Sequence, residues 1–127
     1  MSDQEELPRL LVEAFDGERE LVDWTMTLSP SQRKDIFWWL AEPKSEAARK
    51  RRAEDLAERF MATMEAEREL PGFIRQALND AGAMKGWKSM TALQRRMHLL
   101  AVFRPKGLEG RERQVEKLVE AAVARSR

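Results

Sequence analysis

The chain has 127 residues, of which 43% are hydrophobic and 35% are charged, a balance typical of a folded protein with a highly charged surface. Its 23 Lys and Arg face 22 Asp and Glu, and this near neutrality argues against a protein that seeks nucleic acid over its whole surface. Cysteine is absent, which excludes disulfides and thiolate metal sites. No apolar run approaches about 18 residues and the N-terminus is acidic, so we expect no membrane span and a cytoplasmic location.

An internal repeat organises the sequence. Aligning residues 7–24 with 70–87, and 28–61 with 90–123, gives 13 identities in 52 positions with one residue lost between the two blocks. Two unrelated charged helices could match at a few Glu and Arg by chance, but not also at prolines and tryptophans. Such matches between the copies are Leu7-Pro8 with Leu70-Pro71, Trp24 with Trp87, and Pro43-Lys44 with Pro105-Lys106. We conclude that one unit of about sixty residues is written twice.

Each copy is predicted to form four helices. In the first copy, a helix begins near Pro8 and runs through Phe15, and the turn signal Asp16-Gly17 separates it from a short helix that carries Trp24. A third helix starts with Ser29 as its cap and Pro30 in its first turn, and ends near residue 42 because Pro43 removes an amide donor. The fourth runs over residues 45–67. The second copy repeats the plan over 71–80, 83–88, 91–103 and 108–125.

The apolar spacing in each helix predicts which side chains are buried. In the third helix the buried stripe should be the stem of Arg33 with Ile36, Phe37 and Leu40. In the long helices the expected seams are Ala53, Leu56, Ala57, Phe60 and Met64 in the first copy, and Val115, Leu118, Val119 and Ala122 in the second. No segment alternates in the manner of a strand. We therefore predict an all-α fold: two tandem pseudo-repeated four-helix units, residues 1–65 and 66–127, packed face to face through the fourth helix into one compact helical domain.

The stretch from Leu28 to Arg52 resembles a signature of the YdeI/OmpD-associated, or bacteriocin-protection (OmdA-like), family, in which LSPSxRR is followed by a Trp and then by AKxxETRxRRI. The residues of the first copy that fall on this pattern are Arg33, Trp39, Lys44, Arg49, Arg51 and Arg52. Those of the second copy are Arg95, Lys106, Glu109, Arg111 and Arg113. The copies depart from the pattern at Ala47 and Ala48 in the first and at Ala101 and Gln114 in the second.

This resemblance implies a helical fold and an association with resistance to antimicrobial peptides. The familiar module is a C-terminal helical segment that follows a β-containing domain, whereas here the helical segment occurs twice. The resemblance also implies a periplasmic setting, which the acidic N-terminus does not support.

Catalysis finds little support in the sequence. His98 is the single histidine, and a general base needs an orienting partner and a substrate cleft. The carboxylates are interleaved with Lys and Arg, which is typical of surface ion pairing rather than of metal binding. We therefore expect no enzyme, no metal and no cofactor.

The basic residues around the two prolines are the candidate partner surface. The cations expected to meet at the corners are Arg33, Lys44, Arg49 and Arg52 in the first copy, and Arg95, Lys106 and Arg111 in the second. Arg51 and Arg113 complete the candidate surface. Guanidinium groups at such a corner can hold a phosphate or carboxylate through forked contacts. The other reading, which we favour because both copies retain these residues, is that they bridge helices to nearby glutamates or helix-end carbonyls.

Trp38 completes the candidate set. Adjacent helix positions point about 100° apart, so Trp38 and Trp39 are not both expected in one small core. Trp38 either marks a contact with the second copy or a partner, or lies flat along its own unit. The leading hypothesis is a non-enzymatic binding or adaptor protein, monomeric or homodimeric, that binds a protein or an anionic partner. The resemblance places it in bacterial stress or antimicrobial-peptide resistance. The alternative is a nucleic-acid-associated regulator that uses the basic helix at Arg49–Arg52.

Overall fold

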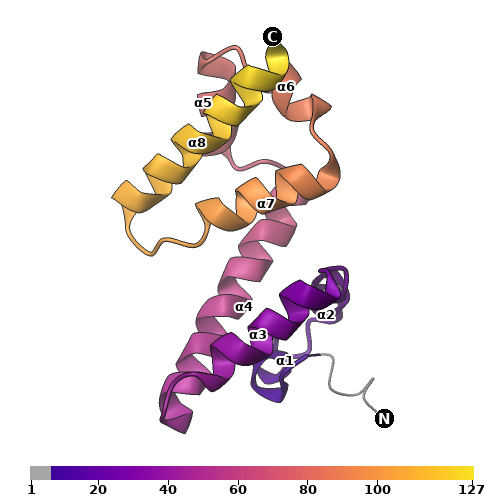
Figure 1. The fold of residues 1–127 in the computed structure, drawn as a ribbon, viewed down its shortest axis with the longest axis vertical. Coiled ribbons are helices and arrows are strands. Elements are labelled where there is room, and N and C mark those ends of the chain that lie inside the picture. Colours follow the sequence, from indigo (N-terminus) through magenta and orange to yellow (C-terminus); the bar gives the residue numbers. More distant parts are fainter. Residues whose placement is uncertain (1–6) are drawn as a thin grey trace. The chain divides into compact units, whose positions relative to one another are not determined.

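The computed structural model describes residues 7–127, and within that range the protein is built from eight α-helices without a strand (Figure 1). In the first copy these are α1 (Arg9–Ala14), α2 (Arg19–Met26), α3 (Pro30–Ala41) and α4 (Glu46–Arg68). In the second copy they are α5 (Gly72–Asp80), α6 (Met84–Ser89), α7 (Ala92–Val102) and α8 (Leu108–Ser126). The all-α prediction is confirmed, and every predicted helix is found close to its expected bounds.

The chain divides into two compact units, of which the first ends at Met61 and the second begins at Ala62. The division falls inside α4, so the last turns of that helix belong to the second unit. The predicted boundary, between residues 65 and 66, lies about one turn further along the same helix. The close packing of both units into one domain stays a prediction.

The third helix of each copy begins with the same reciprocal cap. In α3 the amide of Gln32 donates to the Ser29 hydroxyl at 3.1 Å, and the Ser29 amide donates to the Gln32 side chain at 3.0 Å. In α7 Thr91 and Gln94 form the same pair, at 3.1 and 2.9 Å. Each box satisfies two amides that a helix start leaves without partners. At its other end α3 stops at Ala41, before Pro43, as predicted.

The core of the first unit forms around Trp24 and Phe60. Their ring centroids lie 5.4 Å apart with the planes tilted by 56°, a geometry that aromatic pairs favour. The expected seam of α4 is confirmed by the burial of its members, which are Ala53, Leu56, Ala57, Phe60 and Met64.

The second unit packs α5, α6 and α7 against α8, as Figure 1 shows for the C-terminal half of the chain. Trp87 is buried like its counterpart Trp24, but the residue equivalent to Phe60 is Ala122. Because this alanine is small, α6 approaches α8 closely through Gly86. A Cβ atom at Gly86 would lie 1.8 Å from the carbonyl oxygen of Ala122. The second unit therefore replaces an aromatic contact with close backbone packing.

The predicted stripe of α3 needs one correction. Ile36 and Leu40 are buried, but Phe37 is 36% exposed. The helix carries apolar side chains on more than one side, and only the side with Ile36 and Leu40 faces the core. Phe37 instead shares the outer side of α3 with Trp38.

Candidate functional site

The turn between α3 and α4 is held by two of the predicted arginines. Arg49 donates through Nη1 to the carbonyl of Pro43 at 2.7 Å. Arg52 donates through Nη1 to the carbonyl of Trp39 at 3.0 Å and to the carboxylate of Glu42 at 2.8 Å. Its guanidinium also lies 3.9 Å from the centre of the Trp39 ring. Both side chains therefore bind the end of α3 to α4, the bridging role that the sequence favours.

The corresponding arginines of the second unit also make contacts within it. Arg95 donates through Nη1 to the carbonyl of Met90 at 2.5 Å. The guanidinium of Arg111 lies 6.0 Å from the ring centre of Phe73 and 5.8 Å from that of Phe103. These distances lie at the outer limit of a cation–π contact, which is about 6 Å. Sequence reasoning missed both aromatic partners, because neither Phe73 nor Phe103 lies on the same helix as Arg111.

The remaining cations of the predicted set, apart from Lys44 and Arg51, are Arg113, Arg33 and Lys106. Arg113 forms an exposed ion pair with Glu109 at 3.5 Å, and such pairs contribute little to stability. Arg33 lies with Nη1 4.0 Å from the sulfur of Met26, and its Nε is buried. Lys106 is exposed in the loop before α8.

Some exposed cations of the first unit differ from these, among them Lys44, Lys50 and Arg51. Within residues 7–127 none of the three makes a hydrogen bond or an ion pair. They lie in a basic segment, since residues 33–52 hold seven Lys or Arg and three Asp or Glu, a net charge of +4. These cations can meet an external anion without first breaking a contact inside the part of the chain that the structure describes.

The outer face of α3, defined as Lys34, Phe37, Trp38 and Ala41, is the most exposed apolar surface in the basic segment. Its members recur at the i, i+3, i+4 and i+7 positions that share one side of a helix. Trp38 is 76% exposed, and Lys34 and Ala41 are also exposed. A tryptophan this exposed is uncommon in a folded protein, and exposed apolar groups that adjoin one another are typical of binding surfaces. Sequence reasoning selected Trp38 but missed Lys34 and Phe37, although their helical spacing from Trp38 was visible.

The matching face of α7, defined as Arg96, Leu99, Leu100 and Phe103, occupies the equivalent positions of the second copy. Here Leu99 and Leu100 are buried. Arg96 forms a forked ion pair with Glu67 of α4, with Nε 2.5 Å from Oε2 and Nη2 3.0 Å from Oε1. Leu99 also belongs to the same core cluster as Ala66, the residue before Glu67. The same face is thus used for packing in one copy and exposed in the other.

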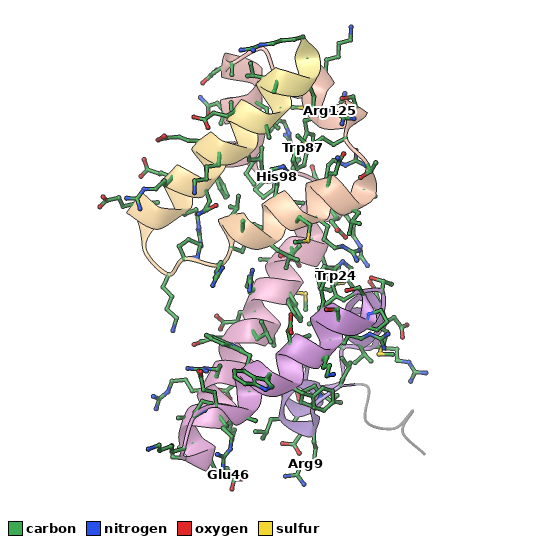
Figure 2. The ribbon with its side chains drawn as sticks, in the orientation of Figure 1. Arg9, Trp24, Glu46, Trp87, His98 and Arg125 are labelled. Carbon is green, nitrogen blue, oxygen red and sulfur yellow. The ribbon has the colours of Figure 1, made fainter. Side chains whose placement is uncertain are left out.

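His98 occupies the α7 position equivalent to Ile36 and is half-buried beside the core of the second unit (Figure 2). Burial lowers the pKa of His98 below its ordinary value, because an apolar setting disfavours the imidazolium. It makes no hydrogen bond or ion pair with any described residue, so no orienting group prepares it as a base. In the described part of the chain, no three His, Asp or Glu side chains gather as they would around a metal ion.

The fold and the site together define a class: an all-α protein made of two copies of one four-helix unit, with an aromatic and basic surface on the first. The family model described as "Bacteriocin-protection, YdeI or OmpD-Associated" matches the chain twice, over residues 5–62 and 67–124. The chain belongs to this family and carries its helical module in tandem. No curated protein and no solved structure matches the chain. Within residues 7–127, none of the helices combines the length and the apolar character that crossing a bilayer requires.

Proposed function

We propose that this protein is a non-enzymatic binding module that takes part in protection against bacteriocins by binding an acidic protein through its first unit. The binding surface consists of the outer face of α3 together with the exposed cations Lys44, Lys50 and Arg51. The family's name associates it with bacteriocin protection. The exposed apolar and basic side chains of this surface would contact the acidic partner.

The observation that supports the proposal most directly is Trp38, which is 76% exposed within a segment of net charge +4. Tryptophan and arginine are the side chains that most often dominate the binding energy of protein interfaces. Unpaired cations around such an anchor attract an acidic partner and raise its association rate. The arginines that clamp the corner, Arg49 and Arg52, keep this surface rigid, which lowers the entropy cost of binding.

A complementation experiment tests this proposal. In a bacterium whose own copy of the gene is deleted, the wild-type chain should restore survival under a bacteriocin, whereas Trp38→Ala and the double variant Lys50→Glu/Arg51→Glu should not. Leu93→Ala is the matched control, because Leu93 is also largely exposed, at 63%, but lies on α7 of the second unit. Circular dichroism of each purified variant checks that the helices are intact. Full survival with Trp38→Ala and with the double charge reversal would contradict the proposal.

The nucleic-acid alternative remains a prediction with its own readout. A chain that binds DNA through Lys44, Lys50 and Arg51 should lose affinity steeply with salt, because each phosphate contact releases counterions. Retention of a labelled duplex at low salt that disappears with Lys50→Glu/Arg51→Glu would favour this alternative. The cytoplasmic location and the monomeric or homodimeric state also stay predictions, which cell fractionation and sedimentation would test.

A further inference from the structure

We infer that the outer face of α3 binds an α-helix of a partner protein in which a glutamate directly follows a small apolar residue, so that the partner repeats what the end of α4 does for α7. This inference rests on the proposed function and specifies the chemistry of the acidic partner. It comes from comparing the two copies, because the second copy shows an occupied version of the face that the first copy exposes.

The occupied version is defined by the last turns of α4. Thr63, Ala66 and Glu67 lie at the i, i+3 and i+4 positions of one helix face, and both Thr63 and Ala66 are buried. Glu67 forms the forked ion pair with Arg96. The turns of α4 that meet Arg96 of α7 therefore carry an acid beside two small, buried residues.

The first copy presents the same arrangement in exposed form. The equivalents of Arg96, Leu99 and Leu100 are Lys34, Phe37 and Trp38. The cation is retained, and both apolar positions carry larger side chains than in α7. Lys34 makes no ion pair with any described residue, so its ammonium group is available for a carboxylate. An amphipathic helix that lays one side on a neighbouring apolar surface is a common mode of peptide recognition.

The carboxylate that pairs with Arg96 in the second copy has no charged equivalent in the register of the repeat. The residue equivalent to Glu67 is Gln4, which lies outside the described residues and carries no charge. We assign the carboxylate to an external helix, and a chain without residues 1–6 tests whether the neighbouring acids Asp3, Glu5 and Glu6 supply it instead.

The end of α4 itself provides the probe. A synthetic peptide of residues 56–69, cross-linked between positions 61 and 65 to keep it helical, presents Ala66 and Glu67 on its free side. The cross-link is needed because an isolated helix of this length is marginal in water. Titrated into the full ¹⁵N-labelled chain, the peptide should shift the amides of residues 34–41 and the indole signal of Trp38 in a saturable manner. Lys34→Glu and Trp38→Ala should each weaken binding tenfold or more.

A charge exchange makes the test specific. A peptide with Glu67→Lys should not bind the wild-type chain but should bind the Lys34→Glu variant with restored affinity. Lys34→Arg, which installs the residue of the second copy, should bind the original peptide more tightly, because a guanidinium can form the forked pair. The control Lys117→Glu should change the affinity by less than twofold, since Lys117 is an exposed lysine on α8 of the second unit and not part of the proposed binding surface.

Several results would overturn the inference. These are the absence of saturable shifts, unchanged affinity in Lys34→Glu, or shifts confined to residues 96–103. Self-association that Trp38→Ala abolishes would assign the face to a second copy of this chain, and binding that appears only after removal of residues 1–6 would assign it to that segment. If the peptide does not bind but Trp38→Ala still abolishes bacteriocin survival, the inference fails and the proposed function stands. If the peptide binds but survival is unaffected, the proposed function fails.

Discussion

The guanidinium of Arg52 lies 3.9 Å from the centre of the Trp39 ring, and the same side chain donates to the Trp39 carbonyl at 3.0 Å. One residue of α4 therefore holds both the ring and the backbone at the end of α3. The second copy has Gln114 and Ala101 at the equivalent positions, so it lacks this clamp. In that copy Arg111 closes the corner instead, by lying near the ring of Phe103. The turn between α3 and α4 and its equivalent between α7 and α8 are therefore held by different contacts.

Replacing Arg52 tests the clamp in the first unit. Arg52→Ala removes the ring contact and two hydrogen bonds, of which one is to Glu42. Because Arg52 remains 29% and Glu42 56% exposed, we expect a loss of about 1–2 kcal/mol in unfolding free energy rather than the larger cost of a buried pair. Urea unfolding followed by circular dichroism measures the loss, and hydrogen exchange should place it in α3.

The neighbouring residue supplies the control for this measurement. Arg51 is exposed and makes no ion pair within the described residues, so Arg51→Ala should stay within about 0.5 kcal/mol of the wild type. Equal losses in the two variants would show that helix propensity or charge, and not the Trp39 contact, accounts for the effect.

The contact between Gly86 and Ala122 leads to a second prediction. A Cβ at position 86 would meet the backbone carbonyl of Ala122 at 1.8 Å, and backbone atoms cannot move aside as the end of a side chain can. Gly86→Ala should therefore force α6 away from α8 and destabilise the second unit by about 1–3 kcal/mol or more. A drop in the thermal unfolding midpoint would measure this.

Gly72→Ala is the matched control, because a Cβ there meets nothing within 4 Å. Alanine favours a helix over glycine by about 0.5–1 kcal/mol, so this variant should be neutral or slightly more stable. If Gly86→Ala behaves in the same way, the close approach of α6 and α8 is not a feature of the folded protein.

The sequence was sufficient for the helices because their ends carry strong local signals. Pro30, Pro43 and the capping residues Ser29 and Thr91 act on the backbone within one turn, and tertiary packing does not change them. The repeat was equally visible, since it depends only on residue identity. These features are local, and local features can be read without coordinates.

Surface and contact assignments depended on information that the sequence does not contain. Phe37 was expected in the core because its spacing from Ile36 and Leu40 fits one stripe, but spacing alone does not decide which of two apolar sides of a helix faces inward. The contact of Arg111 with Phe73 joins residues 38 positions apart, and no local pattern indicates such a pair. The ion pair of Arg96 with Glu67 has the same origin.

The two capping boxes permit a paired prediction across the repeat. Ser29→Ala and Thr91→Ala each remove a hydroxyl that accepts the amide of the third helical residue, at 3.1 Å in both copies. Each should lower the unfolding free energy by about 0.5–2 kcal/mol. Ser29→Ala should fray the start of α3, and Thr91→Ala should fray the start of α7. Hydrogen exchange of the amides of Gln32 and Gln94 checks this. Glycine at either position should cost only a few tenths of a kcal/mol, so equal effects of alanine and glycine would contradict a capping role.

The last prediction concerns pH and His98. Burial lowers the pKa of His98 in the folded protein, whereas in the unfolded chain it keeps the ordinary value of about 6.5. As the pH falls below about 6.5, the unfolded chain takes up a proton before the folded protein does, so the unfolding free energy decreases. The contribution of neutral His98 to the unfolding free energy is fully present above about pH 6.5. It is lost progressively as the pH falls through the lowered pKa of His98 in the folded state. Histidine is the side chain whose ordinary pKa lies in this window, and His98 is the only histidine in the chain.

His98→Ile, which installs the residue found at the equivalent position of the first copy, removes the titration while keeping an apolar side chain beside the core. We expect the wild type to lose stability between about pH 7 and pH 5 and the variant to lose less, with the difference between them growing as the pH falls. Urea unfolding at about pH 7.5, 6.5 and 5.5 measures it. Parallel losses in the two proteins would show that His98 is not desolvated in the folded state, and the half-buried position described for it would then be wrong.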